Sequence, residues 1–319
     1  MSNKTVLIIT NQKEQEVDGV IDFLRTHNID IIRWNLCQFP EKEFYTINSS
    51  SLLYPTLKVG VNPSLCWLHH FGQFSIEKSL IGLEREISLK ETRSFVEGVM
   101  YSLGCNWYNE PLSIIHASNK VFQLQLAQRL EIPVPKYLIT NDKEQVKKFV
   151  AEQKSVVIKS ISTGFISYGE QNFKVYTRQF SELPEDLIFA LKFSPIIIQQ
   201  EIKKKREFRI TVVEEQCFSV EVNHANLSSI IDVRELIREE NRSYFKKATD
   251  IQDIERLSVK LTKELGLIYA GVDWVESEDG QYFFLELNPL GSFKWYEQCG
   301  NFDITSAIGN SLIRKIFNE

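Results

Sequence analysis

Between residues 270 and 289, two apolar, aromatic-rich runs flank the dipeptide Asp279-Gly280. This pattern is typical of a β-hairpin, because Asp-Gly accepts the backbone angles of a two-residue turn. With that turn, Asp273 lies directly opposite Glu286 on the neighbouring strand. The sequence therefore predicts a hairpin that places two carboxylates face to face.

Two like charges opposite each other destabilise a sheet by up to about 1 kcal/mol, and by more when they are desolvated. A divalent cation between them reverses that effect. Asn288 follows Glu286 by two positions, so its amide shares the same face, even if the register slips by two residues. Carboxylate and amide oxygens are ligands that Mg²⁺ accepts. A solvated acidic face is the alternative, but the neighbouring Phe283 and Phe284 favour a buried strand and hence a metal site.

Further charged residues stand where strands or helices begin or end. Lys159 ends an apolar run and Lys120 opens a predicted helix, although a solvated surface charge is the ordinary interpretation of a lone lysine. Glu207 and Arg209 alternate within an apolar strand, so both point to one face and need an ion pair or a polar ligand. The preceding run 203–206 is expected to be a solvated loop.

Composition excludes several classes of protein. The chain has 319 residues, 37 of them basic and 42 acidic, so its formal net charge is −5. A mildly acidic chain is a poor general nucleic-acid binder, and no apolar run is long enough for a membrane helix. With no signal or transit peptide apparent, we expect a cytoplasmic protein without nucleic-acid or membrane partners.

Cysteine and histidine spacing suggests neither a metal nor a redox motif. The five cysteines are far apart without any CxxC, which is typical of reduced, mostly buried thiols. The histidines are also scattered, apart from the pair His69-His70 at the end of an apolar run. That pair is expected to be structural or substrate-facing rather than metal-binding.

The order of predicted elements indicates an α/β fold with α+β lobes. A strand at 5–10, a helix at 17–27 and a strand at 29–34 form a βαβ unit with a parallel sheet. The dinucleotide motif GxGxxG is absent after the first strand, so NAD and FAD are not assigned. A long helix is expected at 76–103. At this length two or three lobes are expected, and we place them at 1–115, 116–195 and 196–319.

The remaining two lobes mix strands and helices. Prolines at 133 and 135 end a helix that begins near Asn119. Further helices are expected from about 141, at 250–265 and at 304–316. Strands are expected at 136–140, 155–159, 173–177, 196–200, 207–213, 217–223, 267–275 and 282–287.

An ordered set of short motifs then points to a family. In chain order they are Asn119-Lys120, Ile132-Pro133-Val134-Pro135, Val157-Ile158-Lys159, Gln199-Gln200-Glu201-Ile202, Glu207-Phe208-Arg209 and Leu285-Glu286-Leu287-Asn288-Pro289. Each motif is weak, but their order resembles the ATP-grasp superfamily over essentially the whole chain. This resemblance implies an ATP-grasp fold with an N-terminal Rossmann-like pre-ATP-grasp domain, a central lobe and a C-terminal lobe.

Within that superfamily the sequence looks most like the maturases of graspetides, the microviridin-type ribosomal peptides. The residues that carry this likeness are Trp34-Asn35, Trp107-Tyr108-Asn109-Glu110-Pro111, Leu138-Ile139-Thr140-Asn141, Asp232-Val233-Arg234 and the segment 291–297. Three departures concern the substrate side. Family members carry arginines in place of His69-His70 and a tryptophan in place of Val233. The segment 160–165 has fewer glycines than a typical phosphate-covering loop.

The resemblance implies roles for individual residues. Lys120 and Lys159 would contact the ATP phosphates, Gln200, Glu201 and Ile202 would read adenine through their backbone, and Glu207 would hold the ribose. Arg209 would face the γ-phosphate and the acyl phosphate, and Asp273, Glu286 and Asn288 would hold Mg²⁺. Asp232 and Arg234 would lie on the acceptor or carboxylate side of the substrate.

The implied reaction is an ATP-dependent ligation within one peptide. Asp or Glu side chains of a precursor peptide, leader plus core, would become acyl phosphates and form esters with Thr or Ser, or amides with Lys. The family also suggests a possible homodimer. Two alternatives stay open: a ligase that joins an amino acid to a peptide or small acid, and a non-catalytic peptide-binding scaffold. The presence of all three predicted metal ligands disfavours the scaffold.

Overall fold

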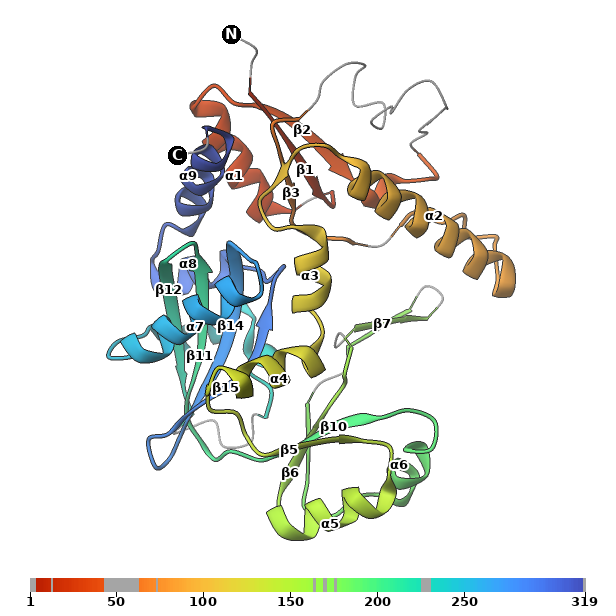
Figure 1. Cartoon of the computed structure of the whole chain (residues 1–319), viewed down its shortest axis with the longest axis vertical. Helices are drawn as coiled ribbons and strands as arrows, with labels where there is room; N and C mark the ends of the chain where they lie inside the picture. Colours follow the sequence, from red (N-terminus) through yellow and green to blue (C-terminus); the bar gives the residue numbers. More distant parts are fainter. Residues whose placement is uncertain are drawn as a thin grey trace.

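The computed structural model describes residues 4–12, 14–42, 63–72, 74–162, 165–168, 171–174, 177–224 and 231–317. Three sheets follow one another along the long axis of the molecule (Figure 1). The N-terminal sheet lies at one end, the sheet of the C-terminal part in the middle, and the sheet of the central part at the other end. No helix in the described ranges has both the length and the apolar character needed to cross a membrane.

The N-terminal sheet is parallel, with the order β2-β1-β3-β4. Its elements are β1 (Thr5–Thr10), α1 (Gln15–Thr26), β2 (Asp30–Asn35), a 3₁₀ turn (Leu36–Gln38), β3 (Leu65–Leu68), α2 (Gly82–Ser102) and β4 (Asn106–Trp107). The predicted βαβ unit is thereby confirmed. The helix expected from residue 76 begins later, at Gly82. After β2 the chain crosses to the other side of β1, so the winding direction changes between β1 and β3.

Two short helices lead to the central sheet, which is antiparallel with the order β5-β10-β6-β9. Asn119 caps the second helix, because its side chain accepts a hydrogen bond from the backbone of Phe122 at 3.1 Å. The helix predicted from 141 is capped by Asp142 instead. The elements are α3 (Pro111–Ala117), α4 (Lys120–Arg129), β5 (Tyr137–Thr140), α5 (Lys143–Gln153), β6 (Val156–Lys159), β9 (Arg178–Phe180), α6 (Glu185–Ala190) and β10 (Ile196–Gln200).

The strand expected at 173–177 differs in the structure. β8 (Gln171–Lys174) pairs with β7 (Phe165–Tyr168) in a ribbon of its own, residues 175–176 lie outside the described residues, and β9 begins at Arg178. β10 pairs with both β5 and β6. The division of the chain into lobes at 1–115, 116–195 and 196–319 stays a prediction. Because β10 belongs to the central sheet, its pairing favours placing the boundary between the second and third lobes at Gln200.

The sheet of the C-terminal part is antiparallel, with the order β13-β12-β11-β14-β15. Its helix α7 covers one face, where Trp274 and Phe284 are fully buried. The helix α9 packs instead against α1 of the N-terminal unit (Figure 1). The elements are β11 (Lys204–Val213), β12 (Gln216–Asn223), two 3₁₀ turns (Val233–Leu236 and Glu239–Tyr244), β13 (Phe245–Lys247), α7 (Gln252–Glu264), β14 (Tyr269–Ser277), β15 (Tyr282–Asn288), α8 (Lys294–Gly300) and α9 (Ile304–Phe317).

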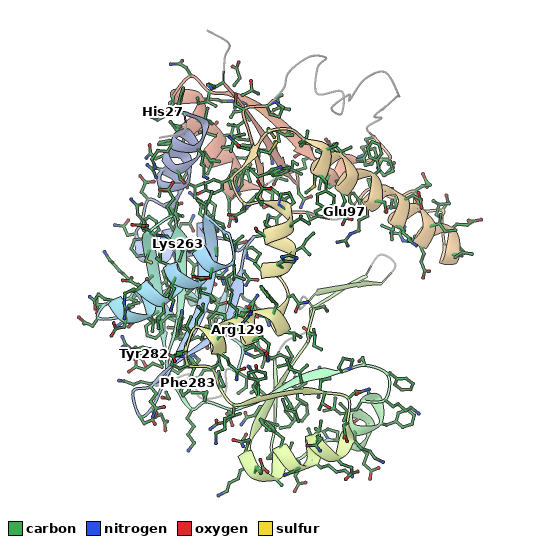
Figure 2. The ribbon with its side chains drawn as sticks, viewed as in Figure 1. His27, Glu97, Arg129, Lys263, Tyr282 and Phe283 are labelled. Carbon is green, nitrogen blue, oxygen red and sulfur yellow. The ribbon has the colours of Figure 1, made fainter. Side chains whose placement is uncertain are left out.

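The β14–β15 hairpin confirms the predicted pairing of Asp273 with Glu286. The loop and the strand register that produce this pairing differ from those predicted. The two-residue turn was wrong. Ser277 donates to the carbonyl of Gln281 at 2.9 Å, so the loop has three residues and ends on a left-handed Gly280. This extra residue shifts the register by one. Leu285 then forms a bulge opposite the Asp273–Trp274 step and shifts the register back. Tyr282 and Phe283 begin β15 near the loop (Figure 2).

Two buried side-chain amides fasten this hairpin to the preceding part of the chain. Asn109 accepts from the backbone of Ile268 at 2.8 Å and of Tyr269 at 3.2 Å, and donates to the carbonyls of Tyr269 and Pro289. Gln123 of α4 exchanges two hydrogen bonds with the backbone of Leu287, at 2.8 and 2.9 Å. These amides therefore hold the outer ends of β14 and β15.

We expect Asn109→Ala to lower the free energy of unfolding by about 2–4 kcal/mol, because it leaves several buried backbone groups without partners. Urea denaturation measures this loss. Asn310→Ala, at an exposed position of α9, is the control and should change stability by less than about 0.5 kcal/mol. Equal stability of the two variants would contradict the role given to Asn109.

Candidate active site

A cleft of about 550 Å³ lies between the central sheet and the sheet of the C-terminal part. Its walls come from α4, β6, β10, β11, β14, β15 and the segment around Asp232. Ten of the twelve predicted site residues line it: Lys120, Lys159, Gln200, Glu201, Ile202, Glu207, Asp232, Arg234, Asp273 and Glu286. Arg209 and Asn288 are not among the lining residues.

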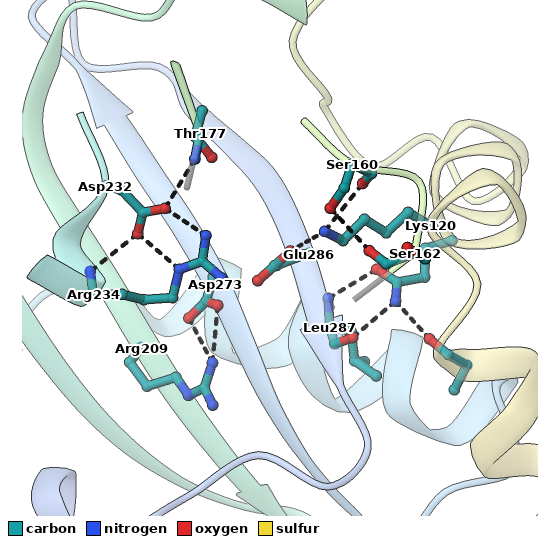
Figure 3. Close-up of polar contacts among 12 residues, drawn as sticks. Lys120, Ser160, Ser162, Thr177, Arg209, Asp232, Arg234, Asp273, Glu286 and Leu287 are labelled. Carbon is teal, nitrogen blue, oxygen red and sulfur yellow. Dashed lines mark hydrogen bonds and ion pairs between the residues drawn. The ribbon is translucent and has the colours of Figure 1, made fainter. Parts of the chain in front are cut away.

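Asp273 and Glu286 form the centre of the site (Figure 3). Arg209 Nη1 donates to both carboxylate oxygens of Asp273, at 2.9 and 2.8 Å. Lys120 Nζ lies 3.3 Å from Glu286 Oε2 and also donates to the carbonyl of Ser160. Each carboxylate thus has a cation beside it, supplied by a different element.

Burial makes it costly for both carboxylates to carry a negative charge. Burial and the neighbouring Glu286 raise the pKa of Asp273 to about 6, although Arg209 opposes the shift. Burial also acts to raise the pKa of Glu286, but Lys120, Lys159 and Arg234 together hold that pKa below its usual value. A divalent cation between the two groups would relieve their repulsion. The donor set of hard oxygens on adjacent strands therefore fits Mg²⁺, with Asp273 and Glu286 as the carboxylate ligands.

Lys120, Lys159 and Lys204 are among the lysines that line the cleft. Lys159 ends β6, and Lys120 and Lys204 are both close enough to repel it. Burial, together with the repulsion from Lys120 and Lys204, lowers the pKa of Lys159 to about 8. Lysines crowded in this way are stabilised by a polyanion such as a chain of phosphates.

Glu207 is held by two residues that the sequence analysis missed. Lys204 Nζ lies 2.6 Å from Glu207 Oε2, and His224 Nε2 lies 3.5 Å from it. The run 203–206 was expected to be a solvated loop, but this was wrong: β11 begins at Lys204, and Arg206 pairs with Glu221 and Glu276. A register shift between Lys204 and Arg206 brings the Lys204 side chain to the cleft. The position of Lys204 could not be predicted from the sequence, because the alternation of side chains assumes a regular strand.

Asp232 and Arg234 act as a unit. Asp232 begins a 3₁₀ turn and accepts from the backbone of Arg234 at 3.1 Å and from its Nε at 2.8 Å. It also accepts from the backbone of Thr177 at 3.2 Å. Burial alone would raise the pKa of Asp232, but these hydrogen bonds and the Arg234 charge lower it. Asp232 therefore positions the guanidinium of Arg234 beside Glu286 and Asp273 (Figure 3).

Gln200, Glu201 and Ile202 connect β10 to β11 and so link the two sheets at the edge of the cleft. Gln200 donates its backbone N–H to Lys136, and Glu201 donates to Ser155. Of the departures from the family pattern, Val233 lines the cleft, whereas His69-His70 lies in the N-terminal unit, at the end of β3. Thr163 and Gly164 of the segment 160–165 lie outside the described residues.

Arg209 lies beneath Asp273, with a side chain that is 11% exposed. Two glycines make room for it. A Cβ atom on Gly271 would lie 2.5 Å from its Cζ, and one on Gly291 would lie 2.5 Å from its Nη2. The ring of Tyr296 packs against the guanidinium at 5.2 Å. Asn288 pairs with Gly271 at the end of β15, and its role as a metal ligand stays a prediction.

A cleft between two sheets that holds lysines and a carboxylate pair agrees with the resemblance to the ATP-grasp superfamily, and the comparisons with known proteins show the family. The model of the RimK-like ATP-grasp domain matches residues 117–312. The chain belongs to this family of ATP-dependent ligases, which confirms the fold class expected from the sequence.

Particular proteins resemble larger parts of the chain. The macrocyclase MdnC of Microcystis aeruginosa MRC, solved with the precursor peptide MdnA, is 28% identical, with a TM-score of 0.83 over 97% of this chain and 99% of that one. A RiPP-associated ATP-grasp ligase of Chryseobacterium gregarium, solved with ADP and with a leader and core peptide, has the same fold, with a TM-score of 0.81, 23% identity and coverage of 98% and 97%. The tetrahydromethanopterin:α-L-glutamate ligase of Methanocaldococcus jannaschii is 27% identical over 65% of this chain and 70% of its own.

We expect Gly271→Ala to lower ATP turnover about 100-fold, because the new Cβ displaces the Arg209 guanidinium from Asp273 and misaligned groups lose about that much rate. ADP release measures turnover. Gly104→Ala, which meets open space, is the control and should leave the rate unchanged. Circular dichroism should show the same fold for both variants, and normal turnover in Gly271→Ala would contradict the assignment of Arg209.

Proposed function

We propose that this protein is a graspetide-type macrocyclase, which forms ester or amide crosslinks within a ribosomal precursor peptide. The observation that carries this proposal is the likeness to MdnC over 97% of the chain at 28% identity. That likeness includes the N-terminal unit, which lies outside the part matched by the family model. A leader and core peptide would be the substrate, and ATP with Mg²⁺ would be consumed.

The residues singled out from the sequence have the following roles in this proposal. Lys120 and Lys159 bind the ATP phosphates, Gln200, Glu201 and Ile202 bind adenine through their backbone, and Glu207 binds the ribose. Asp273, Glu286 and Asn288 hold Mg²⁺. Lys120 and Lys159 line the same cleft as the carboxylate pair, and Lys120 lies 3.3 Å from Glu286, which supports these roles because ATP phosphates need cations close to the metal ligands.

The proposed chemistry follows from the poor reactivity of a carboxylate. A peptide Asp or Glu side chain attacks the γ-phosphorus of ATP, ADP leaves, and an acyl phosphate forms. A Thr or Ser hydroxyl, or a Lys amine, of the same peptide then attacks the acyl carbon, and phosphate leaves. Bound Mg²⁺ supplies charge neutralisation at the phosphoryl group. Arg209 adds a second positive charge beneath Asp273.

Arg234 is placed to orient the reacting peptide carboxylate. Its guanidinium is anchored by Asp232 and is only partly exposed, so its position is set before substrate binds. Holding both reacting groups of one chain in place supplies much of the rate, which explains why a leader peptide would bind separately. We further propose three lobes, with edges near 115 and 195–200, a cytoplasmic location and a possible homodimer.

A second candidate function is an intermolecular ligation. The likeness to tetrahydromethanopterin:α-L-glutamate ligase over 65% of the chain favours this alternative, in which an amino acid is joined to another molecule. The substrate side of the cleft, where Val233 replaces an expected tryptophan, is where the two functions would differ.

The mass of the product separates the two functions. We expect a short Thr/Glu/Asp-rich peptide encoded beside the protein, incubated with ATP and Mg²⁺, to lose one water per ring formed. Mass spectrometry with tandem fragmentation detects this loss and places the ring. A product heavier by one amino-acid residue would instead support intermolecular ligation and contradict macrocyclisation.

We expect Glu286→Gln to lower ATP turnover on the order of 1000-fold, because a metal ligand supports several kcal/mol of charge stabilisation. The fold should remain, since glutamine keeps the shape of the side chain and its amide oxygen can still accept from Lys120. Glu152→Gln, at an exposed position of α5, is the matched control and should turn over ATP normally. Mg²⁺-dependent ADP release retained by Glu286→Gln would refute the metal assignment.

A further inference from the structure

A second cluster of chemically active side chains lies outside the cleft, in the N-terminal unit. Its residues follow two adjacent parallel strands: Glu14 comes after β1, and His69-His70 comes directly after β3. The winding of the sheet reverses between these two strands. At such a point the segments leaving the two strands diverge, and the opening between them is where α/β sheets bind ligands.

The three residues converge there. One possible ligand atom from each of Glu14, His69 and His70 lies within 4.8 Å of the other two. His70 Nδ1 lies 3.5 Å from Glu14 Oε1. Two ligands of a tetrahedral zinc ion are also about 3.4 Å apart, given bond lengths of about 2.0–2.1 Å. This pair is therefore already spaced for a shared metal.

Each imidazole has a buried nitrogen that makes no hydrogen bond to the described part of the chain, although His70 Nδ1 lies 3.5 Å from Glu14 Oε1. His69 Nδ1 and His70 Nδ1 are both buried and make no hydrogen bond within the described residues. His69 is 1% exposed as a residue, so water does not solvate it. A buried imidazole nitrogen without a partner is costly, and a bound cation would satisfy it.

His69 also has the support that metal-binding histidines need. Its Nε2 lies 3.1 Å from Glu16 Oε2. The other oxygen of Glu16 accepts from the backbone of Phe293 at 3.1 Å and of Lys294 at 3.0 Å. A carboxylate behind a histidine fixes the orientation of the ring and increases its basicity as a ligand.

We propose that Glu14, His69 and His70 bind a divalent transition metal, of which Zn²⁺ is the representative. Imidazole nitrogens suit zinc and its neighbours in the first transition row, whereas Mg²⁺ and Ca²⁺ prefer oxygen ligands. This site therefore differs in ligand chemistry from the Asp273–Glu286 pair. Three protein ligands leave a coordination position open, so the bound metal would accept an oxygen ligand such as a carboxylate.

From the sequence alone, His69-His70 was expected not to bind a metal. The fold alters this interpretation because it brings a third ligand to the pair. The two histidines are sequence neighbours without zinc spacing, but the third ligand, Glu14, stands at the start of α1, more than fifty residues earlier. The parallel pairing of β1 with β3 brings Glu14 to them. Only the tertiary arrangement therefore forms the ligand set.

Isothermal titration of the untagged full chain with Zn²⁺ tests this proposal. Excess Mg²⁺ is present throughout to occupy the oxygen site, and neither ATP nor peptide is added. We expect about one Zn²⁺ per wild-type chain, and at least about tenfold weaker binding in both Glu14→Gln and His70→Gln. His116→Gln, at an exposed position of α3, is the control and should bind zinc as the wild type does.

Two results would overturn the site: wild-type protein that binds no zinc, or Glu14→Gln and His70→Gln variants that bind it with unchanged affinity. Circular dichroism of each variant shows whether the fold is kept, and Glu14 and His70, which are only partly buried, tolerate substitution better than His69. Because the measurement uses no ATP turnover, failure of the zinc site and failure of the proposed macrocyclase function are separate outcomes.

Discussion

The arrangement of the cleft depends on two buried carboxylates that face each other across adjacent strands. Asp273 and Glu286 repel each other, and three nearby cations offset this repulsion. The cations come from separate elements: Arg209 from β11, Lys120 from α4, and Arg234 from the segment after β12. Burial makes each of these pairings stronger than it would be at the surface. In the proposed function, Mg²⁺ would take the place of these cations beside the carboxylates, and the phosphates of ATP would take the place of the carboxylates beside the cations.

The position of this pair is fixed from outside the hairpin. Asn109 and Gln123 belong to the segment that precedes the central sheet, yet they bond the backbone at the outer ends of β14 and β15. The hairpin is therefore held at the ends farthest from its turn. Gly271 and Gly291 complete the frame by leaving the space in which the Arg209 guanidinium lies.

Much of this could be predicted from the sequence, because hydrophobic periodicity and proline breaks mark most elements, and the alternation along β14 and β15 puts the carboxylates on one face. The pairing of Asp273 with Glu286 was predicted correctly although the turn was not, since the Leu285 bulge offsets the third loop residue. Bulges carry no sequence signal of comparable strength, and for the same reason Lys204 was missed. His224 and the Glu14–His69–His70 cluster depend on contacts between distant segments, which no local pattern encodes.

The packing of α9 on α1 has a consequence for how the protein is made. Ile304, Ile308 and Leu312 share one apolar core with Val17, Val20 and Leu24. During synthesis, β1 and β3 supply their share of this core early, whereas the share of α9 is missing until the central part and the hairpin have been made. The core of the N-terminal unit is therefore completed by a helix that follows both the central part and the hairpin in the chain.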